Sequence, residues 1–403
     1  MHIKKRASLT ALVGVLALTG AACGSDKKDS SSSNASGSQT EQRPADMVTA
    51  IPSLSGVGTS VILDAGTAGA LKSLGVAIAP SGKATFEAST STITFPITSG
   101  YAEIHSDPNT KPGNIMGSIV HQDSGFTLSA GKTKVELSDL IVDPGNSMVY
   151  GSVGGKPGIP LLSLDGTGVK VSMEGGNVVL FGTVAKLTDT AATALNGAFK
   201  TDAIKPGLPL GVVRLVAKGT ANTYDANGDK TAEVNRLSGK QTAVTLDPGT
   251  AGALKSLGVA VAPSGNAKFD AATSTVSFPI TGGFAAIHSD KGYQPGYIVG
   301  NVIHQGSGLK FSKGSKSITV SDFVVDPGAS TLTATAGGKA GVPLLSLDGT
   351  AVQVSQEGSD VVLQGTVAKL TATGASALNS TFGVSAFKEG IPLGVVRLTA
   401  SQA

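Results

Sequence analysis

The stretch NVVLFGTVAKL, residues 177–187, consists mainly of β-branched and other apolar residues and follows the turn-forming run MEGG. Short apolar runs bounded by turn residues are typical of β-strands. Further stretches share this composition, and many of them alternate apolar and polar residues: TSTITFPIT (90–98), GNIMGSIVH (113–121), GFTLSA (125–130), KVELSDLIVD (134–143), GVKVSM (168–173) and PLGVVRLVA (209–217). The chain is therefore predicted to be mainly β.

Two stretches depart from this pattern and favour short helices. In GTAGALKSLGV, Leu71 and Leu74 fall at helical spacing, and Thr67 is a candidate N-cap. In TDTAATALNGAF, apolar residues share one helical face, with Thr188 or Asp189 as the candidate cap. Together with many glycine-rich turns, these features predict an antiparallel β-sandwich or barrel with two short α-helices.

This unit occurs twice in the chain. Residues 61–216 (copy one) align without a gap with residues 244–399 (copy two), and more than half of the positions are identical. The histidines keep the same offset of 183 residues, which pairs His105 with His288 and His121 with His304. We expect two tandem domains of ordinary size, at 47–217 and 241–403, joined by a polar linker at 218–240.

The N-terminal region predicts export and a lipid anchor. Residues 1–22 combine a basic start with a short apolar run, as secretory signal peptides do, and the run is too short for a transmembrane helix. Cys23 follows two alanines, which resembles the lipobox of bacterial lipoproteins, whose cysteine is diacylated. Residues 23–46 are rich in Ser and Gly and are expected to form a disordered tether. The expected location is the extracytoplasmic face of the cell membrane.

Composition excludes several classes of protein and site. The chain has 31 Lys and Arg and 28 Asp and Glu, and residues 1–22 hold three of the basic residues, so the remainder carries no net charge. A nucleic-acid partner is not expected from such a balance. Cys23 is the only cysteine, which excludes disulfides and thiolate chemistry within the folded part.

The order of motifs in each copy resembles the HtaA-type haem-binding domain of actinobacterial cell-surface proteins. The shared layout includes an early helix, a histidine region at HQDSG (121–125) and HQGSG (304–308), a DPG turn, an L-x-x-L-D segment and a closing helix. The resemblance implies a haem-binding module in which an early tyrosine takes the iron and a histidine supports it. In this chain Tyr101 of copy one corresponds to Phe284 of copy two.

The histidines are also candidate ligands on their own chemistry. In each copy an aspartate stands two residues after a histidine, so both side chains would share one face of a strand. If the two predicted strands pair as a hairpin, the second histidine of the copy could approach the first near the open end. Two imidazoles and a carboxylate suffice for a zinc or copper site. The candidate residues are His105, Asp107 and His121 in copy one, and His288, Asp290 and His304 in copy two. The alternative is that these histidines are surface or structural residues.

A weaker candidate lies in the predicted linker. Asp225, Asn227 and Asp229 have the spacing that opens a calcium loop, but the later positions depart from that pattern, and a solvated turn is the alternative. The repeated aspartates beside Gly or Pro are expected in turns. Arg214 and its equivalent, Arg397, lie inside apolar strands and are expected to pair with one of these aspartates.

Two functions from different classes follow from these observations. The first is a membrane-anchored, non-enzymatic binding module, with haem or a divalent transition metal as the candidate ligand. The second is a structural or interaction protein of the cell envelope without a small-molecule ligand, whose partner would be another envelope protein. No set of nucleophile, acid and base supports an enzyme.

Overall fold

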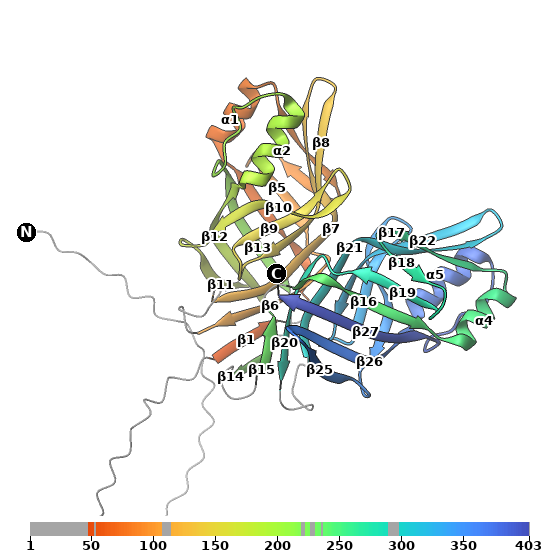
Figure 1. Cartoon of the computed structure of the whole chain (residues 1–403). Coiled ribbons are helices and arrows are strands. Elements are labelled where there is room, and N and C mark those ends of the chain that lie inside the picture. Colours follow the sequence, from red (N-terminus) through yellow and green to blue (C-terminus); the bar gives the residue numbers. More distant parts are fainter. Residues whose placement is uncertain are drawn as a thin grey trace, which may run out of the picture. The chain divides into compact units, whose positions relative to one another are not determined.

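A computed structural model describes residues 47–51, 54–106, 114–218, 222–225, 230–234, 237–288 and 298–402. These residues belong to one compact unit, Ala45–Ala403. They form two antiparallel, nearly closed sheets and four short helices, which confirms the predicted mainly β fold (Figure 1). None of the described helices is long and apolar enough to cross a membrane.

Copy one lies in a 14-stranded sheet with the order β14-β1-β6-β7-β8-β9-β10-β12-β13-β2-β5-β4, in which β11 also pairs with β12 and β3 with β7. Its elements are β1 (Met47–Ile51), β2 (Ser55–Leu63), α1 (Ala65–Ser73), β3 (Ala77–Gly82), β4 (Thr85–Glu87), β5 (Thr92–Pro96), β6 (Ser99–His105), β7 (Ile115–Ala130), β8 (Thr133–Asp143), β9 (Met148–Val153), β10 (Lys156–Asp165), β11 (Lys170–Glu174), β12 (Asn177–Leu187), α2 (Asp189–Phe199), β13 (Pro209–Lys218) and β14 (Asn222–Asp225).

Copy two repeats this order in a 13-stranded sheet, β15-β20-β21-β22-β23-β24-β26-β27-β16-β19-β18, with β17 beside β21 and β25 beside β26. Its elements are β15 (Lys230–Val234), β16 (Leu237–Leu246), α4 (Pro248–Ser256), β17 (Ala260–Gly265), β18 (Lys268–Asp270), β19 (Thr275–Pro279), β20 (Gly282–His288), β21 (Ile298–Lys313), β22 (Lys316–Asp326), β23 (Thr331–Ala336), β24 (Lys339–Asp348), β25 (Gln353–Glu357), β26 (Asp360–Leu370), α5 (Ala372–Phe382) and β27 (Pro392–Gln402).

The segment predicted as a linker contributes strands to both sheets. Within 218–240, β14 pairs with β1, and β15 pairs with β20. Strand β16 also begins inside this range, at Leu237, and pairs with β27. The described parts of the segment therefore extend the sheet edges on both sides of the repeat boundary.

Each sheet curls until its ends nearly meet. In copy one the backbone N–H of Thr98, just after β5, donates to the Val120 carbonyl of β7 at 2.9 Å, and Thr281 donates to Ile303 at 2.8 Å in copy two. The long strand β7 bends at a bulge between His121 and Gly125. A Cβ atom at Gly125 would lie 2.0 Å from the Leu137 carbonyl oxygen, so only glycine permits this approach of β7 to β8.

The helices begin at side-chain caps. Asp64 caps α1 by accepting a hydrogen bond from the Thr67 N–H at 2.7 Å, so the expectation that Thr67 itself is the cap is wrong. The Thr67 hydroxyl instead donates to the Pro209 carbonyl and ties the helix to β13. Thr188 caps α2 as predicted. Each cap satisfies a backbone donor that the first turn leaves open.

The two copies meet at a seam in which equivalent residues face each other. Tyr101 and Phe284 occupy equivalent positions, and their rings stack with centroids 5.6 Å apart. Val120 and Ile303 are another equivalent pair, and both are buried in one cluster with residues of β8 and β22. A surface that pairs with its own equivalent is the arrangement found in two-fold symmetric dimers.

Polar side chains cross this seam in both directions. Gln122 donates through Nε2 to the carbonyl of Asp322, and Gln305 donates in the same way to the carbonyl of Asp139. In copy one only, the Gln122 Oε1 also accepts from the Gly341 N–H at 3.2 Å. The interface is thus approximately, but not completely, symmetric.

Candidate ligand-binding cavity

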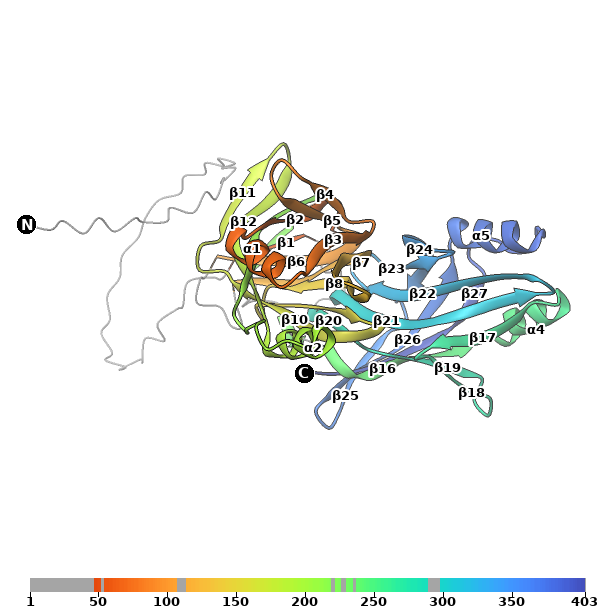
Figure 2. The same cartoon turned by 90° about the horizontal axis from the view of Figure 1, so that it is seen from above.

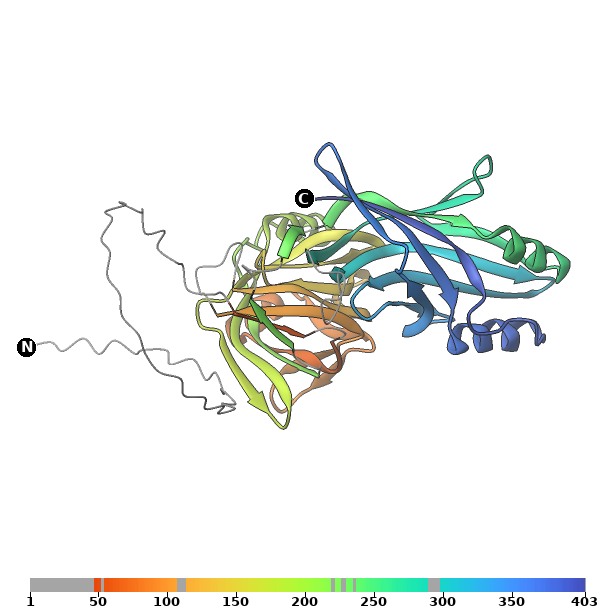
Figure 3. The same cartoon turned by 90° about the horizontal axis from the view of Figure 1, so that it is seen from below.

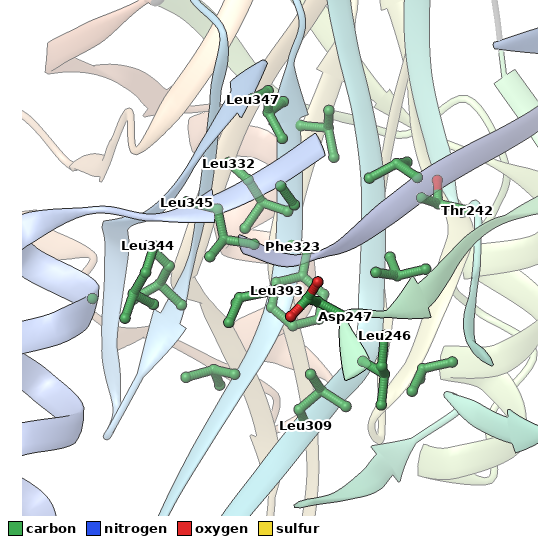
Figure 4. Close-up of a pocket in the computed structure, with 18 of the residues that line it drawn as sticks. Thr242, Leu246, Asp247, Leu309, Phe323, Leu332, Leu344, Leu345, Leu347 and Leu393 are labelled. Carbon is green, nitrogen blue, oxygen red and sulfur yellow. The ribbon is translucent and has the colours of Figure 1, made fainter. Parts of the chain in front are cut away.

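Each copy contains an apolar cavity that is partly open to solvent, and the two cavities differ in size. The volume is about 990 Å³ in copy two and about 420 Å³ in copy one. Figure 4 shows leucine side chains from several strands around the cavity of copy two, with Phe323 beside them. Ligand pockets commonly occupy 300–1,000 Å³ and are lined mainly by apolar side chains. The larger cavity therefore has the size and lining of a small-molecule site.

Alternation along the strands creates this lining. In β16, Thr242, Val244 and Leu246 point to the same side of the sheet and line the cavity. In β26, lining residues run from Leu363 to Leu370. In β16 the alternate residues face the other side, so a curled sheet with apolar residues at about every second position produces an apolar interior.

One histidine in each copy lies in the cavity wall with both ring nitrogens engaged. In copy two, His304 Nδ1 is 2.9 Å from the Pro279 carbonyl oxygen, and Nε2 is 3.1 Å from the Thr242 hydroxyl. A carbonyl oxygen can only accept, so Nδ1 carries the proton and Nε2 accepts from the hydroxyl. His121 makes the equivalent contacts with Pro96 and Thr59.

Burial keeps these imidazoles neutral. It lowers the pKa of His121 and of His304 to about 4, against the opposing effect of the hydrogen bonds to Pro96 and Pro279. Phe95 and Phe278 lie beside the two rings, with centroids 6.3 Å away in each copy. At neutral pH each cavity wall therefore carries an uncharged histidine.

A hydrogen-bonded turn contributes lining residues at one end of each cavity. In copy two, Asp348 accepts from Lys369 at 2.7 Å and from the Thr350 hydroxyl at 2.7 Å. In copy one, Asp165 has the same partners in Lys186 and Thr167. The hydrogen bond from the lysine and then those from the threonine hold the pKa of each aspartate well below its usual range. We call this the turn end of the cavity.

The helix end of the cavity differs between the copies. In copy one Thr67 and Leu71 of α1 are buried, whereas α4 of copy two buries no side chain. Leu254, the equivalent of Leu71, lines the larger cavity together with Thr250 and Lys255. Figure 2 and Figure 3 show α4 and α5 at the same end of copy two. The cavity of copy two reaches this end, and that of copy one does not.

The predicted pair of His105 and His121 is not brought together. Strands β6 and β7 do form a hairpin, but its register places His105 beside Asn114, whose carbonyl accepts from the His105 N–H. His121 lies seven residues farther along β7, a distance of roughly 23 Å along an extended strand. The expected approach of the two imidazoles is therefore wrong, because the shared hairpin holds them at different levels.

His105 has other neighbours. Its Nε2 is 3.3 Å from the Glu103 carboxylate, and Glu103 accepts a hydrogen bond from the Tyr101 hydroxyl. All three side chains are buried. Copy two has Phe284 and Ala286 at the positions of Tyr101 and Glu103, so this polar chain is particular to copy one.

The remaining predicted ligands cannot be placed in a site. Asp107, Asp290, Asn227 and Asp229, and the side chains of His288 and Asp225, lie outside the described structure, so their metal or calcium roles stay predictions. Among the described residues, no group of three or more His, Cys, Asp and Glu is arranged to hold a metal ion.

Arg214 and Arg397 pair with glutamates and not with the expected aspartates. The Arg214 guanidinium is 2.6 Å from the Glu174 carboxylate, and Arg397 is 2.6 Å from Glu357. The aspartates beside Gly or Pro do occupy turns and caps, as expected. For example, Asp143 accepts from the Asn146 N–H at 3.0 Å.

Sequence reasoning found the histidines but missed the threonines that hold them. Thr59 and Thr242 are also 183 residues apart, two residues before the aligned copies begin, so the same offset contained a signal for them. The cavity had no comparable signal, because a strand that lines a cavity and one that packs a core show the same alternation.

The chain was compared with protein families, curated proteins and solved structures, and a likeness was found among the solved structures. No family profile and no curated protein matches the chain. Among solved structures, the chain is similar to the C-terminal domain of HtaA from Corynebacterium glutamicum, with 12% sequence identity and a TM-score of 0.29, over 41% of this chain and 98% of that chain.

Proposed function

We propose that this protein is a non-enzymatic binding module that holds an apolar small molecule inside copy two. The observation that carries the proposal is the cavity of about 990 Å³ between the turn end and the helix end of that copy. Burial of an apolar ligand in such a cavity would gain roughly 25 cal/mol for each Å² removed from water. The smaller cavity of copy one is a second, more restricted site of the same kind.

The interior chemistry supports a ligand whose buried part is uncharged. The His304 ring is neutral and already hydrogen-bonded on both sides. The carboxylates that line the cavity, Asp247 and Asp348, have partners of their own in the α4 backbone and in Lys369. A charged group placed among the leucines would lose its hydration without gaining a partner.

Haem, the ligand that the family resemblance implies, fits these residues poorly. Tyr101 lies at the seam and donates to Glu103, so it is not in the cavity lining, and copy two has a phenylalanine there. The lone pair of His304 Nε2 is occupied by the Thr242 hydroxyl. A haem has two carboxylates that need cationic partners. The charged residues of the cavity lining are two aspartates and one lysine, Lys255, so only one cation would be present. A divalent metal likewise finds a single histidine in each described cavity wall.

We further propose that the folded unit is held at the extracytoplasmic face of the membrane by a lipid on Cys23. The support is the order of features in the sequence: a signal-like segment, a small-residue run before the cysteine, and a Ser- and Gly-rich tether. A diacylated cysteine would anchor more firmly than one acyl chain. In cells, Cys23→Ser is expected to move the protein from the membrane fraction to the soluble fraction. Retention in the membrane fraction would contradict the anchor.

Binding can be tested on the compact unit, Ala45–Ala403, with the neutral fluorescent probe N-phenyl-1-naphthylamine. We expect fluorescence enhancement that saturates, and its loss in Ala368→Phe, because Ala368 lines the larger cavity. The matched variant Ala185→Phe, in copy one, should retain the copy-two signal. Equal binding by all three proteins, with melting curves showing that each is folded, would contradict the proposal.

The same preparation tests haem directly. Titration with haemin should give no Soret shift that depends on His304, so His304→Ala and the parent protein should give matching spectra. A shifted Soret band that is lost in His304→Ala would contradict the apolar ligand and identify haem as the ligand. If neither probe binds, the envelope-structural role becomes the better interpretation.

A further inference from the structure

We infer that the ligand of copy two is a single long acyl chain that lies along the barrel from the helix end toward the turn end. This inference rests on the proposed function and specifies its ligand. Three observations support it: the length of the cavity, the chemistry of its wall, and the different burial of α1 and α4, which share the sequence GTAGALKS.

The cavity of copy two is elongated. Its lining includes Gly349 and Thr350 at the turn end and Thr250 and Leu254 at the helix end. Along β26, the lining residues run from Leu363 to Leu370, about 23 Å of extended strand. A compact ring system would leave part of such a space empty, whereas a flexible chain can fill its length.

The wall has few groups for a polar ligand to bind. The internal hydrogen-bonding side chains near the middle, His304 and Thr242, are bonded to each other. A hydrocarbon chain has no polar groups to satisfy and can bend around the Phe278 and Phe323 rings that line the wall. The interior thus matches the methylene portion of a lipid, with the polar head left outside.

We place the mouth for this chain at the helix end. The turn end is held by Asp348 and its bonds to Lys369 and Thr350. At the other end α4 buries no side chain, and Lys255 of this helix lines the cavity. A head group emerging beside α4 would therefore reach solvent without breaking the bonded turn.

Copy one shows the same barrel with this space filled. Leu71, Leu137 and Leu195 are buried in one cluster there, and none of them lines the smaller cavity. The smaller cavity keeps the turn end, with Asp165 and Thr167, and the level of His121. Copy one can therefore accept only a shorter chain.

The test is displacement of N-phenyl-1-naphthylamine by a homologous series of straight-chain fatty acids, using the unit Ala45–Ala403. Each added methylene that enters the cavity should tighten binding about fourfold, until the chain outgrows the cavity and the gain stops. Ala377→Phe, on α5, places a ring at the helix end and should stop the gain at a shorter chain, since Ala377 lines the cavity. The control is Ala194→Phe, at the equivalent position of copy one, which should keep the parent's series.

If Ala377→Phe does not fold, a second variant takes its place. Leu254→Trp blocks the same end from α4 and should also stop the gain in affinity at a shorter chain. A parallel series of lysophosphatidylcholines asks whether the chain comes from a free acid or from a phospholipid, and the series that competes at lower concentration identifies the source. An affinity that does not depend on chain length, or an unchanged series in both blocked variants, overturns the inference. Probe binding that Ala368→Phe removes would still leave the proposed function standing, whereas absence of probe binding would overturn both.

Discussion

The segment GTAGALKSLGVA occurs at 66–77 and again at 249–260, yet the helix that it forms has two buried side chains in copy one and none in copy two. In copy one Leu71 is 5% exposed and belongs to the main core cluster. In copy two its equivalent, Leu254, lines a cavity. The two helices differ only at their first residue, Ala65 in α1 and Pro248 in α4, so the difference in burial lies mainly in what the shared residues pack against. The comparison shows that the strand pairing of this fold does not depend on a filled interior at the helix end.

The residues beneath the helices differ in size. Ile93 and Leu137 of the core cluster in copy one correspond to Val276 and Val320, each shorter by one carbon atom. Both valines line the larger cavity. Removal of buried methylene groups leaves space when the surroundings relax only partly. Small substitutions in the strands thus accompany a large change in the interior.

The largest expected effect contrasts the two helices directly. Leu71→Ala should lower the free energy of unfolding by about 2–5 kcal/mol, because it removes a buried side chain from a packed core. Leu254→Ala should cost less than half of that, because its side chain is only half-buried and has the cavity on one side of its contacts with the core. Urea unfolding of the two variants in parallel measures both values. Equal losses would show that the two helix ends are packed alike.

A second prediction concerns a feature that the copies share. The pKa of His121 and His304 is lowered to about 4 in the folded protein, so the unfolded chain binds protons more readily between its ordinary pKa of about 6.5 and pH 4. Stability should therefore fall as the pH falls through this range, by about 3 kcal/mol per histidine between pH 7 and pH 4.

Variants separate the two histidines. His121→Gln and His304→Gln should each remove about half of the acid destabilisation that the pair produces, measured as unfolding free energy against pH. If one variant flattens the pH dependence and the other does not, the two histidines have different pKa values. The two cavity walls would then not be equivalent.

The smallest predicted effect tests the seam. Gln122 makes a hydrogen bond through each end of its amide, whereas the Gln305 Oε1 is buried without a hydrogen-bond partner among the described residues. Gln122→Ala should therefore destabilise the protein by about 1 kcal/mol more than Gln305→Ala. Thermal unfolding of the two variants measures the difference. A larger loss for Gln305→Ala would reverse the assigned asymmetry.

Much of the fold was predictable from alternation and turn residues. The strand predicted at 177–187 coincides with β12, and the helix cap at Thr188 is where it was expected. Two predicted strands, 113–121 and 125–130, are one strand, β7, because the bulge before Gly125 lets the chain continue where its sequence indicates a break. Strand β10 was not predicted, since Pro160 disfavours regular pairing, and it lies beside an irregularity in the register.

The site was predictable only in part. The repeat identified His121 and His304, but their expected meeting with His105 and His288 depended on hairpin register, which alternation does not determine. The size of the cavity depends on how deeply α1 and α4 are buried, and the sequence that the two helices share does not indicate this difference in burial. Local pattern thus located the wall residues, while the space between them followed from packing.

The self-complementary seam has a consequence for neighbouring molecules of this protein. Because Tyr101 faces Phe284 and the two glutamines reach across in the same way, each copy presents a surface that fits its twin. The same surface exists on every neighbouring chain. If the two copies of one chain separate, each can therefore pair with the equivalent surface of another molecule. Exchange of copies between two chains would link the two molecules into a pair through the same contacts that now close one chain.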